Sequence, residues 1–203
     1  MILWDVDTQA DFLLPGGKLY VPGAESLLPN LKRLTEWAEK SRTLVIASVD
    51  AHKEGDEEFK DYPPHCLAGT PGQQKIPETR LARQCHIPNR PATLPRDLSA
   101  YQQVIIEKQR TDVFTNPNIE ALLARLGSVD RIVLYGVVTE ICVAHTARGL
   151  VKRGFRIAVV EDAIRPLDEA KSRDLLEDVR RRGGSVVRTD DVVGETLRAS
   201  HGS

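Results

Sequence analysis

The chain has 203 residues and a formal net charge of −1, with 41% hydrophobic and 28% charged residues. These values are typical of one globular domain, and the near-neutral charge argues against a nucleic-acid or anionic-membrane partner. No apolar run approaches the roughly 18 residues of a transmembrane helix, and the chain opens on a strand-like segment without a basic leader. The three cysteines are far apart, so we expect no disulfide framework and a reducing, cytoplasmic location.

Short apolar, β-branched segments recur along the chain and predict strands. They are continuous rather than alternating, which is typical of strands that are covered on both faces in a parallel sheet. The predicted strands are residues 2–6, 43–49, 103–107, 132–138, 156–160 and 185–187.

Helical patterns separate most of these strands, at 24–41, 118–127, 140–154 and 167–184. The first places Leu27, Leu31 and Leu34 on one face, and the last begins with acidic residues and ends with arginines, as the helix dipole favours. The order of elements predicts an α/β fold in one domain over residues 1–203. We expect a doubly wound, mostly parallel sheet of six strands, with helices on both faces.

Residues 51–100 show no strong periodicity and contain seven of the twelve prolines. A segment of this length without regular structure is uncommon in a compact domain unless it is functional or disordered. It follows the second predicted strand, and ligands bind in parallel sheets at the carboxyl ends of the strands. The loop 8–23, Lys108 and Cys142 follow three other strands, so four strand ends are expected to deliver polar groups to one edge.

Cys142 lies where the strand 132–138 leads into a helix that is predicted to begin near Thr139. A helix N-terminus can lower the pKa of a thiol from its ordinary value of about 8.5, and its N–H groups can stabilise an oxyanion. This position suits a nucleophile, although buried cysteine is often only core packing and can also bind metal.

Two charged residues close other strands. Asp7 ends the first strand and could exchange protons with a thiol and a leaving amine, although a carboxylate there is ordinarily a turn former or helix cap. Strand alternation predicts that Asp5 and Asp7 point to the same side. Lys108 ends the third strand, and it would hold a carboxylate and a thiolate in place if both were near. Asp11 is expected to hydrogen bond locally within the loop.

The loop 51–100 begins with a candidate metal site. Asp50 and His52 are two apart on an extended segment, so both can face one way, and His65 follows two prolines. Two histidines with one or two carboxylates suit Zn²⁺, Mn²⁺ or Fe²⁺. The alternative is a solvated acidic loop with two incidental histidines.

Together these segments resemble the isochorismatase-like cysteine hydrolases, and among them the nicotinamidases. "DTQADF" at Asp7 is similar to the D-x-Q-x-D-F start of the family, "EK" to its strand-three lysine, and "GVVTEICV" to its G-x-x-T-[DE]-x-C-V signature. The resemblance implies that Asp7 is the base, that Lys108 assists it, and that Cys142 is the nucleophile. It also implies a cis peptide between Val137 and Val138 and an oxyanion site formed by the N–H groups of Val138 and Cys142.

The loop 51–100 narrows the resemblance from the superfamily to the nicotinamidases, because D-x-H followed by "PPHCLAGTPG" is similar to the corresponding segment of that family. The resemblance implies one divalent ion, Zn²⁺ before Mn²⁺ or Fe²⁺, bound by Asp50, His52, His65 and one more residue. Glu58 is the first choice for that residue and Glu57 the second. An apolar substrate pocket of Phe12, Tyr62 and Phe114 is also implied.

The expected activity is deamidation of nicotinamide to nicotinate and ammonia through a thioester. A role in pyridine nucleotide salvage and a homo-oligomeric state are further implications of the resemblance. Three alternatives stay open. The substrate can be another small amide or a carbamoyl compound, the protein can bind a metal or ligand without turnover, or Cys142 can pair with His145 three residues along the same helix.

Overall fold

The structure is a computed structural model and describes residues 1–199, without the side chains of 195–199. Seven strands form one sheet in the order β3-β4-β2-β1-β5-β6-β7, and every neighbouring pair is parallel. The strands are β1 (Ile2–Val6), β2 (Val45–Asp50), β3 (Gln84–Ile87), β4 (Gln103–Lys108), β5 (Ile132–Val137), β6 (Ile157–Arg165) and β7 (Ser185–Val187). The predicted doubly wound α/β fold is confirmed, with one more strand than expected.

The additional strand is β3, which lies inside the segment that was expected to lack regular structure. Its sequence, QCHI, has no apolar run because it is the edge strand and only Ile87 is buried. The rest of the segment holds three short 3-10 helices, η2 (Glu57–Lys60), η3 (Pro71–Gln73) and η4 (Pro77–Thr79). β6 is also longer than predicted, because it continues to Arg165 through the polar residues Glu161 and Asp162.

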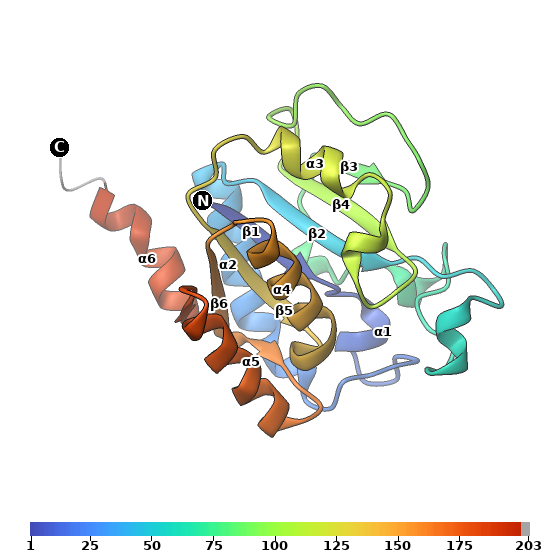
Figure 1. The fold of residues 1–203 in the computed structure, drawn as a ribbon. Coiled ribbons are helices and arrows are strands. Elements are labelled where there is room, and N and C mark those ends of the chain that lie inside the picture. The colour runs from blue at the N-terminus through green and yellow to red at the C-terminus, as the bar shows by residue number, and fades with distance from the viewer. Residues whose placement is uncertain (200–203) are drawn as a thin grey trace.

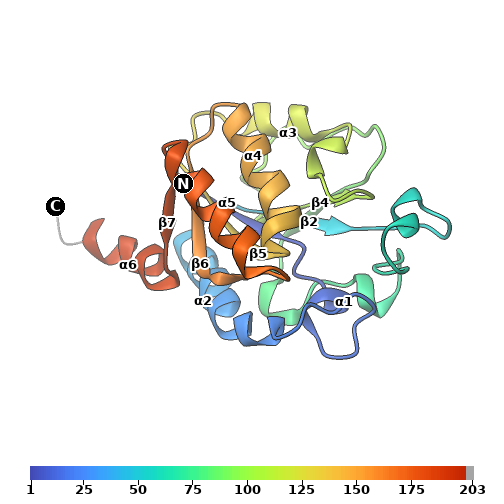
Figure 2. The same cartoon turned by 60° about the horizontal axis from the view of Figure 1, so that its bottom comes forward.

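Helices cover the two faces of the sheet in separate groups (Figures 1 and 2). One core packs α3 (Ile119–Arg125), α4 (Ala144–Lys152) and α5 (Glu169–Arg181) against the strands. The other core packs α1 (Ala10–Leu13), α2 (Leu28–Ser41) and α6 (Thr189–Ala199) on the opposite face. None of the helices in the described part of the chain combines the length and apolar character needed to cross a membrane. Two further 3-10 helices are η1 (Ala24–Leu27) and η5 (Val113–Thr115).

The chain leaves β1 toward β2 on one side and later returns to β5 on the other side of β1. This reversal is the topological switch point, where a crevice opens outside the carboxyl ends of the strands. The residues after β1 and β5 therefore flank the place where an open parallel sheet ordinarily binds its ligand.

Candidate active site

Four strand ends bring charged groups together at the carboxyl edge of the sheet. Asp7 follows β1, Asp50 ends β2 and Lys108 ends β4, while Cys142 lies in a π-helical turn, Thr139–Val143, after β5. The α-helix α4 begins only at Ala144, so the cysteine precedes it instead of lying in its first turn. All four side chains are buried.

Lys108 is the centre of this group. Its Nζ lies 2.9 Å from Asp7 Oδ2 and 3.8 Å from Cys142 Sγ, and it also donates to Asp50 Oδ1. Ser48 Oγ donates to Asp7 Oδ1 at 2.8 Å. The three residues expected to act together in catalysis are thus brought into contact, with Asp50 as a fourth member.

Asp7 reaches this group because its backbone leaves the strand conformation. Its φ is +53°, in the left-handed region that aspartate tolerates better than most residues. Asp5, which alternation predicted to share its side, instead contacts Lys75 Nζ at 2.6 Å and Thr8 Oγ1 at 3.0 Å. The prediction of a shared side was wrong, since alternation holds only while the strand continues.

The protonation states differ from the expectation based on a helix N-terminus. Burial raises the pKa of the Cys142 thiol well above its ordinary value, against the opposing effect of Lys108, and the Asp7 and Asp50 carboxylates raise it further. Burial also raises the pKa of Asp7. The resting group is therefore a thiol next to a carboxylate that binds protons readily, and the thiol needs a base to become a nucleophile.

A cluster of four buried metal-type donors adjoins this group. Asp50, His52, Glu58 and His65 each offer one ligand atom, and these atoms all lie within 4.8 Å of one another. The Nε2 atoms of His65 and His52 are 3.5 and 3.8 Å from Asp50 Oδ2. Two ligands that sit about 2.1 Å from one tetrahedral ion are about 3.4 Å apart, so a small inward shift brings these donors to bonding distance.

The hydrogen bonds around the histidines favour a cation at this cluster. His52 Nδ1 donates to Asp56 Oδ2 at 3.1 Å, and His65 Nδ1 donates to the carbonyl of Pro63 at 2.8 Å. Each bond fixes the proton on Nδ1 and leaves the Nε2 lone pair facing the cluster, an arrangement that is typical of metal-binding histidines. His52 Nε2 is buried and has no hydrogen-bond partner in the described residues. The donor set therefore fits a divalent ion.

Glu58, rather than Glu57, belongs to this cluster. Glu58 Oε1 lies 3.7 Å from His52 Nε2 and 3.8 Å from His65 Nε2, and its side chain is 7% exposed. Glu57 points outward, with a side chain that is 64% exposed and paired with Arg110. The 3-10 helix η2 turns these neighbours in opposite directions, which the sequence could not settle.

The family model of the isochorismatase domain matches residues 2–191. The chain is a member of the isochorismatase family. It is 28% identical over 190 residues to the nicotinamidase/pyrazinamidase of Mycobacterium tuberculosis, and the match covers 86% of this chain and 91% of the relative. The N-carbamoylsarcosine amidase structure from Thermoplasma acidophilum has a TM-score of 0.73 and 28% identity, and covers 93% of this chain and 96% of that one. The pyrazinamidase of Pyrococcus horikoshii in complex with zinc has a TM-score of 0.74 and 27% identity, with 92% and 98% covered.

This isochorismatase-family hydrolase ties its first loop to the metal-type cluster through Gln9 and Asp11, whose contacts the sequence did not predict. The Gln9 side chain donates to the carbonyl of Asp50 at 2.8 Å and accepts from the Asp50 N–H at 2.7 Å. Asp11, expected to bond only locally, accepts from the N–H of Lys18 at 3.0 Å and of Cys66 at 2.7 Å. The D-x-Q-x-D spacing thus fixes two distant segments around the site.

Residues of the catalytic group and of the metal-type cluster line one pocket of the hydrolase. Asp50, Glu58, His65 and Cys142 line a small cavity of about 30 Å³ together with Phe12, Tyr62, Leu19, Thr111, Val138 and Ile141. Phe59, which the sequence analysis missed, packs with ring centroids 4.9 Å from His52 and 5.8 Å from His65. Its only sequence signal is its place directly after Glu58.

Phe114 is not among the residues that line this cavity, and its assignment to the pocket needs correction. Its ring lies against Gly149 of α4, where an added Cβ would come within 1.9 Å, and the Arg153 guanidinium stacks over it at 3.9 Å from the centroid. The short η5 helix directs it toward the core between β4 and α4.

The alternative pairing of Cys142 with His145 has no support in the geometry. His145 is exposed on α4, whereas Cys142 is buried toward Lys108. The peptide bond between Val137 and Val138 is cis, as the resemblance implies.

Proposed function

We propose that this protein is a nicotinamidase that hydrolyses nicotinamide to nicotinate and ammonia. The observation that carries the proposal is the shared pocket: three of the four metal-type donors and the Cys142 thiol line one cavity. A pyridine carboxamide has a ring nitrogen that suits a metal and an amide that suits a nucleophile. The chain would act in pyridine nucleotide salvage.

The metal would be held by Asp50, His52, Glu58 and His65, and zinc is the first choice. The zinc in the Pyrococcus horikoshii pyrazinamidase supports that choice, and Mn²⁺ and Fe²⁺ accept the same ligands. When bound, the ion supplies a Lewis-acid position that can fix the pyridine nitrogen. Phe12 stacks near His65, with ring centroids 5.3 Å apart, and Tyr62 lies 6.5 Å from the same ring, so aromatic side chains flank the position.

The chemical steps belong to Asp7, Lys108 and Cys142. Asp7 takes the thiol proton, and the sulfur attacks the carboxamide carbon to give a tetrahedral oxyanion. The N–H groups of Val138 and Cys142 stabilise that oxyanion. Asp7 returns the proton to the nitrogen, and ammonia leaves as the thioester forms. Asp7 then deprotonates a water that cleaves the thioester, which releases nicotinate and restores the thiol.

Lys108 keeps the charges of this cycle in place. Its ammonium lies between two carboxylates and the sulfur, and burial opposes its charge, but Asp50 and Asp7 outweigh burial and raise its pKa well above the ordinary value. A permanently charged lysine stabilises the thiolate at the moment it forms. The same contact with Asp50 joins the catalytic group to the metal-type cluster.

The cavity is small in this structure, with a volume of about 30 Å³. Tyr62 is half-buried at the cavity, within the loop after β2, so we expect it to move when the substrate enters.

A carbamoyl compound is the second candidate substrate, because the identity to the N-carbamoylsarcosine amidase equals that to the nicotinamidase/pyrazinamidase. The test is to incubate the purified protein, loaded with Zn²⁺, separately with nicotinamide and N-carbamoylsarcosine and to measure ammonia. We expect rapid release from nicotinamide.

The matched controls are Cys142→Ala, which should abolish release, and Cys85→Ala, which should not change it because Cys85 lies on the edge strand β3. Release from the carbamoyl compound alone would reassign the substrate. Full activity in Cys142→Ala would overturn the mechanism.

A further inference from the structure

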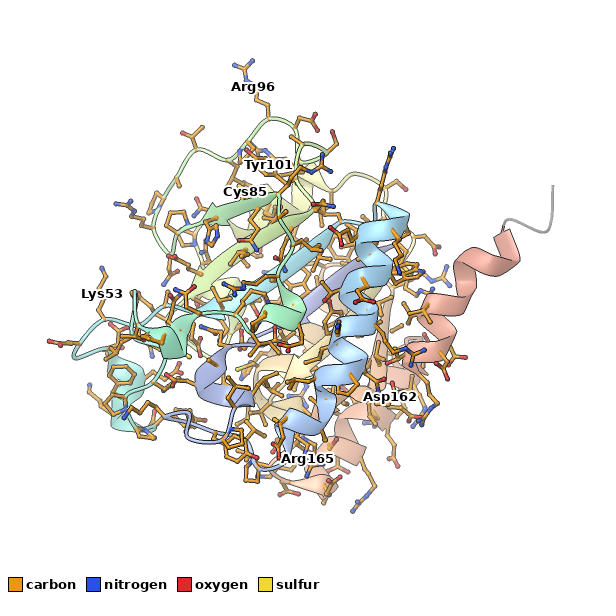
Figure 3. The ribbon with its side chains drawn as sticks, turned by 180° about the vertical axis from the view of Figure 1, so that it is seen from behind. Lys53, Cys85, Arg96, Tyr101, Asp162 and Arg165 are labelled. Carbon is orange, nitrogen blue, oxygen red and sulfur yellow. The ribbon has the colours of Figure 1, made fainter. Side chains whose placement is uncertain are left out.

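A second and larger cavity lies at the opposite end of the sheet from the catalytic group. It has a volume of about 560 Å³, and its lining includes the first residue of β1, Ile2, with Leu44 just before β2 and Gln102 just before β4. β2 runs from this cavity to Asp50, and six residues at about 3.3 Å each separate the two sites by roughly 20 Å. Figure 3 shows Arg96 and Tyr101, which line it, at the far end from Arg165, the last residue of β6.

Arginine dominates the polar lining of this cavity. Arg42, Arg83, Arg96 and Arg125 all line it, against one carboxylate, Asp97. The Asp97 carboxylate bonds to Ser99 rather than to an arginine, because its two oxygens accept hydrogen bonds of 2.8 Å from the N–H and the Oγ of Ser99. The whole chain carries a formal charge of −1, so this concentration of positive charge is local and does not reflect a basic protein.

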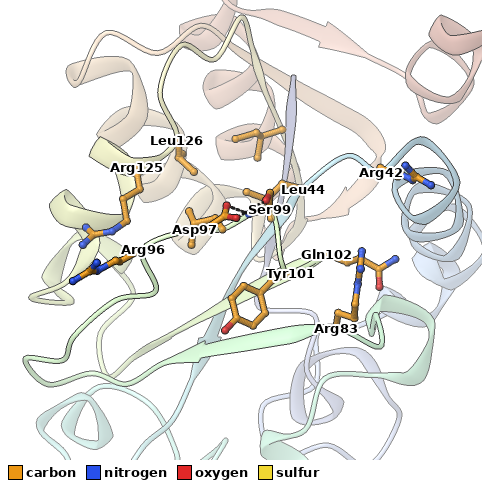
Figure 4. Close-up of a pocket in the computed structure, with 12 residues that line it drawn as sticks. Arg42, Leu44, Arg83, Arg96, Asp97, Ser99, Tyr101, Gln102, Arg125 and Leu126 are labelled. Atoms are coloured by element: carbon orange, nitrogen blue, oxygen red, sulfur yellow. Dashed lines mark hydrogen bonds between the residues drawn. The ribbon is translucent and has the colours of Figure 1, made fainter.

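The guanidinium groups are available to a ligand. Among residues 1–199, the side chains of Arg42, Arg83 and Arg96 make no hydrogen bond or ion pair. Arg125 donates to two backbone carbonyls, from Nε to Pro95 at 3.2 Å and from Nη1 to Ala121 at 2.8 Å, which orients the group without neutralising it. Figure 4 shows Arg96 and Arg125 on one side of the cavity and Arg83 and Arg42 on the other.

The remaining lining is apolar or aromatic. Leu44, Leu98 and Leu126 contribute aliphatic surface, and the Tyr101 ring lies between the two groups of arginines in Figure 4. Guanidinium groups bind phosphate oxygens in bidentate pairs, and a cavity of about 300–1,000 Å³ is the ordinary size of a small-molecule site. An apolar floor between two groups of cations matches an organic molecule that carries phosphate groups.

We propose that this cavity binds a small phosphorylated organic molecule of nucleotide size, with its phosphates on the arginines and its organic part on the leucines and Tyr101. The proposal does not depend on the nicotinamidase assignment, because no residue of the catalytic group or the metal-type cluster lines this cavity. The concave shape and the absence of an overall positive charge favour a small molecule over a nucleic acid, which needs an extended basic surface.

The test measures binding of ATP and of sodium tripolyphosphate to the full chain by isothermal titration calorimetry at low ionic strength, where surface electrostatics are least screened. The variant is Arg83→Ala/Arg96→Ala, which should fold normally because neither side chain has a hydrogen-bond or ion-pair partner in the described part of the chain. The matched control is Arg173→Ala/Arg180→Ala, which removes the same charge from the exposed face of α5.

We expect both probes to bind the unmodified protein, and ATP more tightly because it also covers the apolar floor. The cavity variant should weaken both by about 100-fold, at about tenfold for each lost charge-assisted contact, and the control should change neither. No binding of either probe, or binding that survives in the cavity variant, would overturn the proposal. Equal affinity for the two probes would overturn the organic part of it. Binding through the metal-type cluster would be equal in the two variants, so it cannot imitate the expected result.

Discussion

Replacing Glu58 with glutamine, beside the same change at Glu57, tests the metal centre with a control that is one residue away. The Glu58 carboxylate is buried and lies 3.7 and 3.8 Å from the Nε2 atoms of the two histidines. The Glu57 carboxylate is 64% exposed and pairs with Arg110, which is itself 54% exposed. The two substitutions remove the same charge, so any difference in metal binding comes from position.

The expected magnitudes differ accordingly. Mutation of a residue that only supports a metal ligand lowers metal affinity by about 10–100-fold, so loss of a ligand charge in Glu58→Gln should cost at least about 100-fold, or about 2.7 kcal/mol. Glu57→Gln removes an exposed ion pair worth about 0–1 kcal/mol of stability and should leave metal affinity unchanged. In the metal-free protein, burial and the Asp50 carboxylate disfavour a charged Glu58 and raise its pKa. Metal-free Glu58→Gln should therefore unfold no more easily than the metal-free parent.

Zinc content after dialysis against graded chelator concentrations, measured by inductively coupled plasma mass spectrometry, gives the affinities. Thermal unfolding with and without EDTA gives the stabilities, and EDTA should lower the unfolding temperature of the parent and of Glu57→Gln but have little effect on Glu58→Gln. Zinc lost from Glu57→Gln and retained by Glu58→Gln would refute the assignment of ligands. If both variants retain zinc, neither Glu57 nor Glu58 is a metal ligand.

Four further substitutions, one of them a matched control, test other parts of the structure. Asp7→Asn should lower kcat for nicotinamide by at least about 10³-fold at unchanged zinc content, because the amide cannot take the thiol proton; a loss under tenfold in steady-state assays would exclude Asp7 as the base. Gly136→Ala puts a Cβ 2.0 Å from a β1 carbonyl oxygen at φ +119° and should cost about 3 kcal/mol or more in urea unfolding. Gly154→Ala, at φ +84° with no atom within 4 Å, should cost about 1 kcal/mol, and equal losses would contradict the steric argument. Lys75→Met leaves the buried Asp5 carboxylate unpaired and should cost about 3–5 kcal/mol; a loss below about 1 kcal/mol in the same assay would show that the pair is not important.

The sequence predicted the parts of the fold that depend on continuous apolar runs. Central strands such as β1 and β5 are covered on both faces, and every residue in them is buried. Most of these residues are apolar, so the strands stand out as apolar runs in the sequence. β3 was missed because an edge strand needs no such run. The end of β6 was missed because Glu161 and Asp162 interrupt the apolar run before the buried Ala163 and Ile164. Periodicity reports burial, and it fails where a strand is half exposed.

For the site, the sequence by itself determined which residues stand at the strand ends, and hence the candidates Asp7, Asp50, Lys108 and Cys142. That inference needs only the parallel topology, since parallel strands end at one edge. Tertiary structure alone decided which side chains meet: the left-handed backbone turns Asp7 toward Lys108, η2 buries Glu58 and exposes Glu57, and burial raises the thiol pKa that a helix terminus was expected to lower. Single dihedral angles and the exclusion of water set these outcomes, and neither is written in the order of residues along the chain.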